Sequence, residues 1–444
     1  MKIKIVGFLI FISLIITTVL PSTAMLNKST IKFTSVKYNL LDSGWIEERD
    51  GVSILHLNGT YYNMGYQHGY LLRNEIPINL RIMLKFFNDE YGFSYNDLAR
   101  KWNVIKNYVP EEYLYELQGI ADGSGLYFEE IGVMNIAHDV LNLIHCCGGI
   151  AWGSATVDGK LIHLRSCDMS ISLKDDETGT YLQENQVLIV RDPENGYASM
   201  SPVLSGDIGS YGGINEMGIG VSEATCFTND TTLNGITASF RMRMVLDHTD
   251  NGKEALNIMD SNRTCGWNLL ISDGNIPEGF ILEQTANVSY ISTCDDPIES
   301  TSPFWMIENV TRRACCFVSP DCASLERKNY NPSGLKSLLR YILGVDIYFL
   351  IWTHYKALSK GFENHWGNLD LDTAIDMLRD VYLGKTNFIF KIMMKFKSYQ
   401  PIHQWVACPE TGDMVISFAS VDKMAHYNPV HNFNLFELLE ESPP

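Results

Sequence analysis

Residues 145–168 read His145-Cys146-Cys147-Gly148-Gly149-Ile150-Ala151-Trp152-Gly153-Ser154-Ala155-Thr156-Val157-Asp158-Gly159-Lys160-Leu161-Ile162-His163-Leu164-Arg165-Ser166-Cys167-Asp168. Asp-Gly is a dipeptide typical of tight hairpin turns, and apolar residues lie on both sides of it. We therefore predict two antiparallel strands, 149–156 and 160–165, joined at Val157-Asp158-Gly159.

The predicted hairpin brings three chemically active side chains together. Cys146 lies where the first strand begins, and Arg165 and Asp168 lie where the second ends. Because a hairpin folds back on itself, these strand ends become neighbours, and we expect Arg165 and Asp168 beside Cys146. The simpler interpretation is a buried cysteine near a surface salt bridge, which is common in proteins.

This arrangement suits a cysteine nucleophile. The thiolate is the reactive form of cysteine, and a nearby guanidinium lowers the pKa of a thiol. A carboxylate orients an amine that acts as a base. If the bond between His145 and Cys146 were cut, the new α-amine, with a reference pKa of about 7.7–8.0, would supply that base.

Outside the hairpin, helical and strand patterns alternate along the chain. Further hairpins are predicted at 186–191 with 197–203, 269–272 with 280–284, and 403–407 with 414–418. Helices are predicted at 71–87, from Pro110, and at 128–143, 238–248, 253–259, 335–359 and 372–382. Hairpins interleaved with amphipathic helices predict an α+β domain of two packed sheets with helices outside.

Composition excludes several classes of protein. The net charge of −18 argues against nucleic-acid binding, which needs a basic surface. The adjacent pairs Cys146-Cys147 and Cys315-Cys316 lack the two-residue gap typical of zinc ligands, so we expect no metal site. Ten cysteines in an exported protein suggest some disulfides, and Cys315, Cys316 and Cys322 are expected to form one or to pack in the core.

The first residues resemble a secretory leader. Lys2 and Lys4 precede an apolar run that ends at Leu20, and small residues follow up to Ala24. We predict a signal peptide over residues 1–24, with a retained N-terminal anchor as the alternative. Sequons for N-glycosylation occur at Asn27, Asn58, Asn229, Asn262, Asn287 and Asn309. The chain is thus expected in the secretory pathway, as a secreted or lysosome-like glycoprotein.

Short motifs in a fixed order point to one family. They are Gly65-Tyr66-Gln67-His68-Gly69, read as a turn, Glu116 to Gly123, Trp152 to Thr156, Asp158-Gly159-Lys160, Arg165-Ser166-Cys167-Asp168, Gly213 to Gly220, Arg263-Thr264-Cys265 and Gln404-Trp405-Val406. From about Ser53 to its end, the chain resembles the acyl-CoA:6-aminopenicillanate acyltransferase-like family of self-processing cysteine N-terminal-nucleophile (Ntn) hydrolases. The resemblance implies a four-layer αββα sandwich with mainly antiparallel sheets.

The resemblance also implies self-cleavage between His145 and Cys146. It would leave a leader at 1–24, a mainly helical chain at 25–145 and a chain at 146–444 that begins with the nucleophile, the last two associating as one domain. Cys147 is the alternative nucleophile, if the register is shifted by one. Arg165 would polarise the thiol or the substrate, and Asp168 would hold the new α-amine.

Two further positions are candidates for the oxyanion hole or the pocket, Asn215 and Cys315. Relatives carry an asparagine where this chain has Cys315 in the run Arg312-Arg313-Ala314-Cys315-Cys316-Phe317, and a thiol is a weak donor. A backbone N–H or Asn309 could replace the missing donor.

The resemblance implies an amide hydrolase or acyltransferase that forms an acyl-enzyme on Cys146. Implied substrates are small acylated molecules such as N-acyl amino acids, N-acyl amines or lipid amides, also as thioesters, and no cofactor is needed. One alternative is a catalytically degenerate member that binds an acylated ligand or partner without turnover, since Cys315 replaces asparagine. Another is a phospholipase-like esterase on the same fold.

Overall fold

The computed structural model describes residues 43–141, 145–326, 331–395 and 399–443. The predicted leader at 1–24, its alternative as an anchor, and the sequon at Asn27 lie outside the described residues. Among the described residues, no helix is both long and apolar enough to span a membrane.

The first sheet, sheet A, has nine strands. In spatial order they are β1 (Trp45–Arg49), β2 (Val52–Gly59), β5 (Gln186–Pro193), β6 (Ser199–Leu204), β7 (Gly212–Asn215), β8 (Ile219–Thr225), β9 (Trp267–Asp273), β10 (Glu278–Gln284) and β11 (Ser289–Ser292). Only β2 and β5 pair in parallel, and every other neighbouring pair is antiparallel. The predicted hairpins at 186–203 and 269–284 are confirmed as β5–β6 and β9–β10.

Sheet B has six strands and holds the opening stretch of the sequence. Their order is β12 (Val310–Arg313), β3 (His145–Ala151), β4 (Ile162–Ser170), β13 (Tyr399–Cys408), β14 (Asp413–Phe418) and β15 (His431–Asn434). The β3–β4 hairpin is confirmed, as is β13–β14. The strand bounds differ from the prediction, because Gly153 has a φ of 56° and residues 153–155 form a 3-10 turn.

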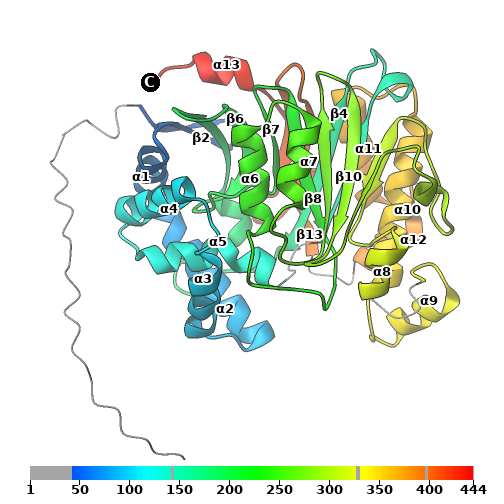
Figure 1. The fold of residues 1–444 in the computed structure, drawn as a ribbon, viewed down its shortest axis with the longest axis horizontal. Coiled ribbons are helices and arrows are strands. Elements are labelled where there is room, and N and C mark those ends of the chain that lie inside the picture. The colour runs from blue at the N-terminus through cyan, green and yellow to red at the C-terminus, as the bar shows by residue number, and fades with distance from the viewer. Residues whose placement is uncertain (1–42, 142–144, 327–330, 396–398, 444) are drawn as a thin grey trace, which may run out of the picture. The chain divides into compact units, whose positions relative to one another are not determined.

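Helices cover the outer face of each sheet, and the helices within residues 61–141, α1 to α5, form a group beside them (Figure 1). α6 (Ala238–His248) and α7 (Gly252–Asp260) contact strands of sheet A, whereas α10 (Tyr348–His365) and α11 (Leu371–Leu383) contact strands of sheet B. β3 and β4 in turn contact β8, so the two sheets pack face to face. The chain therefore has the four-layer αββα architecture that the resemblance implies.

Two helix predictions were wrong. The predicted helix at 335–359 is two helices, α9 (Leu335–Ile342) and α10, because Gly344 has a left-handed φ of 66° between them. The helix predicted at 71–87 is α2 (Glu75–Tyr91), which starts after Asn74. Apart from α1 and α4, which are described below, the other helices are α3 (Tyr95–Ile105), α5 (Phe128–Leu141), α8 (Pro320–Glu326), α12 (Phe388–Met394) and α13 (Leu435–Glu440).

Residues 65–69 do not form the predicted turn but lie inside α1 (Tyr61–Leu71). This helix crosses α4 (Glu111–Ser124) so closely that backbones touch. A Cβ added at Gly65 would lie 2.0 Å from the carbonyl oxygen of Glu116, and one added at Gly119 would lie 2.3 Å from that of Tyr62. Glycine is needed at both positions because no other residue leaves this space.

Residues 43–141 are tied to the rest of the described chain by buried polar contacts. Arg243 Nη1 lies 3.2 Å from Glu116 Oε1, and Tyr113 donates to Asp247 at 3.1 Å. The backbone N–H of Gly206 donates to His68 Nε2 at 2.9 Å. β1 and β2 also come from this segment, so sheet A contains strands from both sides of Cys146.

Candidate active site

Cys146 is the second residue of β3 and is completely buried. β4 runs beside it, with Cys167 directly opposite Cys146 and Arg165 opposite Gly148. Because alternate residues of a strand share a face, these side chains point to the same side of sheet B, towards sheet A. Nη2 of Arg165 donates to the sulfur of Cys146 at 3.2 Å, so the predicted proximity of these two residues is observed.

Glu223, on β8 of sheet A, completes this cluster and was not predicted from the sequence. Its Oε1 is ion-paired with Arg165 Nη2 and lies 3.9 Å from the sulfur of Cys146. Its other oxygen, Oε2, has no hydrogen-bond partner among the described residues. Burial raises the pKa of Glu223 to about 7, although Arg165 opposes that rise. The available signal was a carboxylate inside an otherwise uncharged strand, Ile219–Thr225.

The two facing thiols differ in acidity. Burial raises the pKa of the Cys146 thiol, and its hydrogen bond with Cys167 adds to the rise, while the positive charge of Arg165 opposes it. Burial also opposes ionisation of Cys167, but the hydrogen bond from Cys146 and the charge of Arg165 outweigh it and lower the pKa of Cys167. The other terminal nitrogen of the Arg165 guanidinium, Nη1, lies 3.1 Å from Nε2 of His403. Cys167 is therefore the more readily ionised of the two thiols.

Asp168 is buried on the opposite face of sheet B, three positions beyond Arg165. The hydroxyl of Tyr382, on α11, donates to its carboxylate, at 2.8 and 2.9 Å from the two oxygens. The same hydroxyl lies 3.1 Å from His354 Nε2 and 3.7 Å from the sulfur of Cys147. Burial raises the pKa of Asp168 to about 8, and the hydrogen bond from Tyr382 acts against this rise.

The side chains of Cys146 and Cys147 point to opposite faces of sheet B and contact different residues. Arg165 contacts the sulfur of Cys146, whereas the sulfur of Cys147 faces Tyr382 beside Asp168. Asp168 is opposite His145 in the strand register, so it lies next to the backbone of the predicted cleavage point rather than next to the sulfur of Cys146. The α-amine that cleavage would release at Cys146 is a main-chain group, so it would lie between the two faces of the sheet.

Cys315 contacts the main chain of Cys146 directly. The backbone N–H of Cys146 donates to the sulfur of Cys315 at 3.1 Å, and this sulfur lies 3.3 Å from the carbonyl oxygen of Cys146. Asn268 holds the adjoining turn, because its Nδ2 donates to the carbonyl oxygens of Ala314 and Cys316, both at 2.8 Å. Cys315 is therefore in direct contact with the main chain of Cys146, and its role in an oxyanion hole stays a prediction.

The structure does not bring the two candidate asparagines to Cys146. Nδ2 of Asn215 donates to the carbonyl oxygens of Leu246 and Thr249 at the C-terminal end of α6. Its Oδ1 accepts from the N–H groups of Met217 and Ile219 in the β7–β8 turn. Asn309 precedes β12, where its Nδ2 donates to Ser154 at 2.8 Å and its carbonyl oxygen accepts from the N–H of Trp152. Trp152 is six residues along the chain from Cys146, roughly 20 Å in an extended strand. Neither amide is hydrogen-bonded to Cys146 here, and a role for Asn215 or Asn309 as an oxyanion donor stays a prediction.

The cysteines form no disulfide with one another in the described part of the chain. Cys315, Cys316 and Cys322 are instead buried, which is the second of the two predicted outcomes. Most of the cysteines thus act as small core residues.

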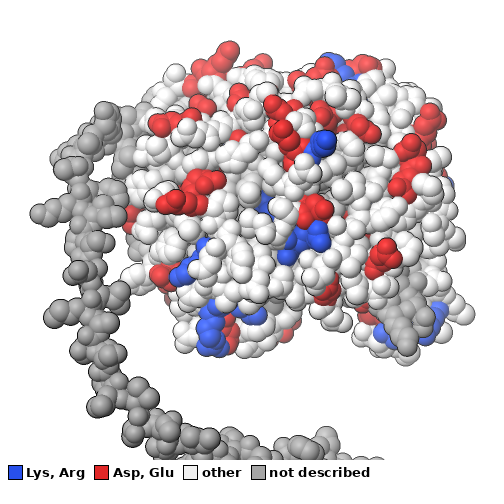
Figure 2. All heavy atoms as spheres, in the orientation of Figure 1, with Lys and Arg blue, Asp and Glu red and all other residues white. Residues whose placement is uncertain are grey.

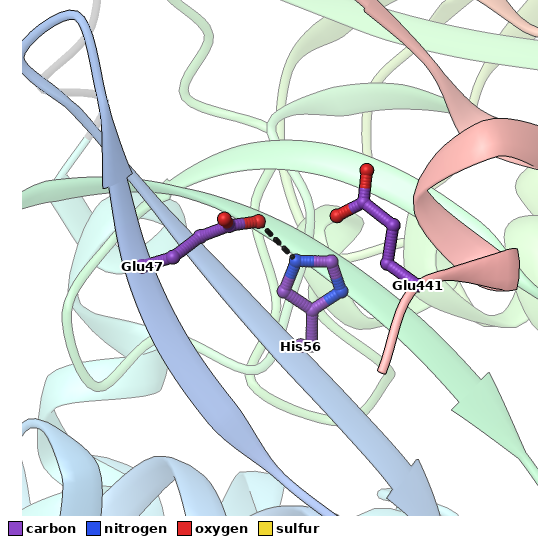
Figure 3. A group of neighbouring side chains, drawn as sticks. All are labelled: Glu47, His56 and Glu441. Carbon is purple, nitrogen blue, oxygen red and sulfur yellow. Dashed lines mark hydrogen bonds and ion pairs between the residues drawn. The ribbon is translucent and has the colours of Figure 1, made fainter. Parts of the chain in front are cut away.

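A second cluster of potential ligand groups lies far along the chain from Cys146. Atoms of Glu47, His56 and Glu441 lie within 4.8 Å of one another, and Figure 3 shows the hydrogen bond between Glu47 and His56. Arg49 donates to Glu47 at 2.6 Å and is also ion-paired with Glu441. Since the guanidinium of Arg49 already pairs with both carboxylates, we interpret the cluster as a tie between β1, β2 and the residues after α13.

Residues 165–297 match a family model described as acyl-coenzyme A:6-aminopenicillanic acid acyl-transferase. Among curated proteins, protein dcd1B of Dictyostelium discoideum is 26% identical over 285 residues, 58% of this chain and 55% of that protein. An uncharacterized protein of Archaeoglobus fulgidus is 25% identical over 272 residues, 54% of this chain and 44% of that protein. The chain spans about half the length of the curated relatives it matches.

Similar solved structures include an N-acylethanolamine-hydrolyzing acid amidase ortholog from Caenorhabditis elegans, 14% identical, with a TM-score of 0.36 over 60% of this chain and 93% of that one. A variant of a conjugated bile acid hydrolase from Clostridium perfringens is 16% identical, with a TM-score of 0.37 over 66% of this chain and 93% of that one. A penicillin V acylase from Agrobacterium tumefaciens is 11% identical, with a TM-score of 0.37 over 66% and 87% of the two chains.

Proposed function

We propose that the chain, whose residues 165–297 match the acyl-coenzyme A:6-aminopenicillanic acid acyl-transferase family model, is an amide hydrolase or acyltransferase with Cys146 as its nucleophile. The contact between Arg165 Nη2 and the sulfur of Cys146, at 3.2 Å, carries the proposal. A guanidinium at this distance stabilises the thiolate that attacks a carbonyl.

The first step is self-cleavage. The sulfur of Cys146 attacks the carbonyl carbon of His145, the C–N bond between them breaks as a C–S bond forms, and the nitrogen takes up a proton. The proton that the Cys146 thiol loses is the one that the nitrogen takes up, so the step balances within the chain. Water then hydrolyses the thioester. Because Cys146 is completely buried in the uncut chain, an acyl substrate reaches it only after this cut.

Turnover then repeats the same chemistry on an external substrate. The thiolate attacks the acyl carbonyl of an N-acyl amino acid, an N-acyl amine or a lipid amide, the amine leaves with a proton, and water releases the acyl group. Asp168, opposite His145 in the register, is one residue from the new α-amine and is placed to hold it as an ammonium. Hydrolysis is favoured over transfer, since acyl-CoA is scarce outside the cytoplasm.

Intact-mass analysis of the wild type, Cys146→Ala and Cys147→Ala tests the nucleophile. We expect two chains that meet at His145/Cys146 in the wild type and in Cys147→Ala, and one uncut chain in Cys146→Ala. If only Cys147→Ala blocks cleavage, the register is shifted by one and Cys147 is the nucleophile.

A second candidate function, an inactive member that binds an acylated ligand, is favoured by Cys315. Its sulfur is a weak hydrogen-bond donor at a position where a stronger one stabilises the oxyanion. One uncut chain in the wild type, with saturable binding of an N-acyl amine, would establish this alternative instead.

We also propose that the chain enters the secretory pathway and is glycosylated. Asn229, Asn262 and Asn287 are sequon residues that are exposed in the structure. Sequencing the mature N-terminus tests the proposal, which requires a first residue near Met25, together with a loss of mass on treatment with a peptide N-glycosidase.

A further inference from the structure

The short helix α9 turns its apolar side away from the protein. Leu335, Leu339 and Ile342 have the i, i+4, i+7 spacing of one helix face, and all three are exposed, Leu335 by 71% and Ile342 by 66%. The residue of α9 that is fully buried is Ser337. A helix that packs on a core shows the reverse arrangement. Leu343, 74% exposed, continues the apolar surface beyond the helix.

The neighbouring helix α12 also exposes apolar side chains to solvent. Phe388, 67% exposed, Ile389 and Ile392 face outward, while Phe390 and Met393 are buried beneath them. α9 and α12 both contact α10. Nδ2 of Asn387 donates to the carbonyl oxygen of Thr353, in the second turn of α10, and α9 leads into the first turn of α10. Both exposed faces therefore lie at the N-terminal end of α10.

We call the exposed apolar residues of these two segments the docking face: Leu335, Leu339, Ile342, Leu343, Val345, Phe388, Ile389 and Ile392. Within the described chain, every exposed leucine belongs to this face. Isolated exposed apolar residues are ordinary, but a concentration of them rimmed by polar groups marks an interaction site.

The charge around the docking face identifies its partner. Residues 335–345 and 385–395 contain no acidic residue, in a chain whose net charge is −18, and their basic residues are Lys336, Arg340, Lys385, Lys391 and Lys395. Arg340 is ion-paired with Asp346 and Lys385 with Asp380, so the remaining three lysines supply the excess positive charge. Figure 2 shows basic side chains at the lower right, where Figure 1 places α9. An amphipathic helix with basic residues beside its apolar face is typical of proteins that lie on an anionic membrane surface.

We propose that the docking face binds the surface of an anionic lipid bilayer. The apolar side chains enter the boundary between headgroups and acyl chains, and the basic residues contact the lipid phosphates. The docking face lies on two short helices, α9 and α12, whose opposite sides pack on the protein, so the proposed binding is interfacial.

The docking face is also connected to the candidate active site. Phe390 lies under it and stacks on His354, with ring centroids 4.4 Å apart. His354 contacts the hydroxyl of Tyr382, which donates to Asp168. This step rests on the proposed function. A membrane-bound amide hydrolase takes its substrate from the bilayer, so the proximity favours lipid amides among the substrate classes.

Sedimentation with lipid vesicles tests the proposal. We expect the wild type to sediment with vesicles of phosphatidylcholine and phosphatidylserine, more weakly with phosphatidylcholine alone, and less as salt is added. Leu339→Asp combined with Ile342→Asp should lower the partition coefficient by roughly tenfold per side chain, as should Ile389→Asp. Ile276→Asp is the matched control, since Ile276 is 70% exposed in the β9–β10 turn, and it should bind as the wild type does.

Three outcomes would overturn the proposal. They are a wild type that stays in solution with both kinds of vesicle, a double variant that sediments like the wild type, and a wild-type dimer that the double variant dissociates while neither binds vesicles. Cys146→Ala must keep its vesicle binding, which separates this test from the proposed function. The double variant should still hydrolyse a water-soluble, short-chain amide at the wild-type rate if the wild type does.

Discussion

Burial and charge act in opposite directions on the side chains around Cys146. Removal from water raises the pKa of Cys146 and of Glu223, and Arg165 opposes both effects because it contacts both groups. A buried ion pair of this kind is weak evidence for stability, since desolvation offsets most of its attraction. Its position between two sheets, in contact with a thiol, instead favours a role in controlling the charge of the nucleophile.

Tyr382→Phe tests whether Asp168 acts as a carboxylate. The hydrogen bond from Tyr382 lowers the pKa of Asp168, so its loss should raise that pKa above about 8. An activity that needs the carboxylate declines as the pH falls through this pKa, and the decline should therefore begin at higher pH in Tyr382→Phe. We expect a displacement of about one pH unit, from the strength of one charge-assisted hydrogen bond.

The measurement is the rate of self-cleavage, or of amide hydrolysis, as a function of pH. Tyr427→Phe, on an exposed tyrosine, serves as the control and should leave the profile unchanged. An acid limb at the same pH in Tyr382→Phe and in the wild type would contradict a role for the Asp168 carboxylate.

Among the elements, the hairpins were predictable because their signals are local. Asp158-Gly159 and Asn195-Gly196 stand between apolar strands, and the β3–β4 and β5–β6 pairs form there. The site was predictable to the same extent: Arg165 follows from the hairpin alone. Glu223 and Tyr382 reach the site from β8 and α11, and no spacing in the sequence reports which element packs against β4.

The mistaken turn at residues 65–69 has a similar explanation. Gly65 and Gly69 suggested a turn, but their role is to let α1 approach α4, which supplies Gly119 and Gly123 at the same spacing. Glycine in a turn and glycine in a close helix crossing look alike until the partner helix is known.

Gly119→Ala should destabilise the protein. The added methyl group would lie 2.3 Å from the carbonyl oxygen of Tyr62, and this contact forces the helices apart. Overpacking of this kind costs about 1–3 kcal/mol, which should appear as a lower Tm in a thermal melt. Tyr115→Ala, on the exposed side of the same helix, should change the Tm little. An unchanged Tm in Gly119→Ala would show that the crossing adapts easily.

For the whole molecule, the junction between the sheets depends on buried charges as well as on apolar packing. Arg165 and Glu223 join β4 to β8, and Arg313 joins β12 to β10 through Glu283 at 2.8 Å. Glu283 also accepts from the N–H of Ser319 at 2.8 Å. These contacts fix how the sheet that carries Cys146 is positioned against its partner.

Glu283→Ala should weaken this junction strongly. It removes one partner of a fully buried pair and leaves the charge of Arg313 less compensated, a change that costs about 3–5 kcal/mol. Urea unfolding measures the loss, with Glu278→Ala on the same strand, but only partly buried, as the control. Equal unfolding midpoints for the two variants would mean that the Arg313 pair contributes no more than a surface contact.

Sheet A has a consequence for the product of self-cleavage, because β2 comes from before Cys146 and pairs with β5 from after it. A cut at His145/Cys146 would sever the backbone while leaving this ladder and the buried bond of Glu116 to Arg243 in place. The product would then be a heterodimer without any covalent link, in which sheet A needs strands from both polypeptides while sheet B stays with the one that begins at Cys146.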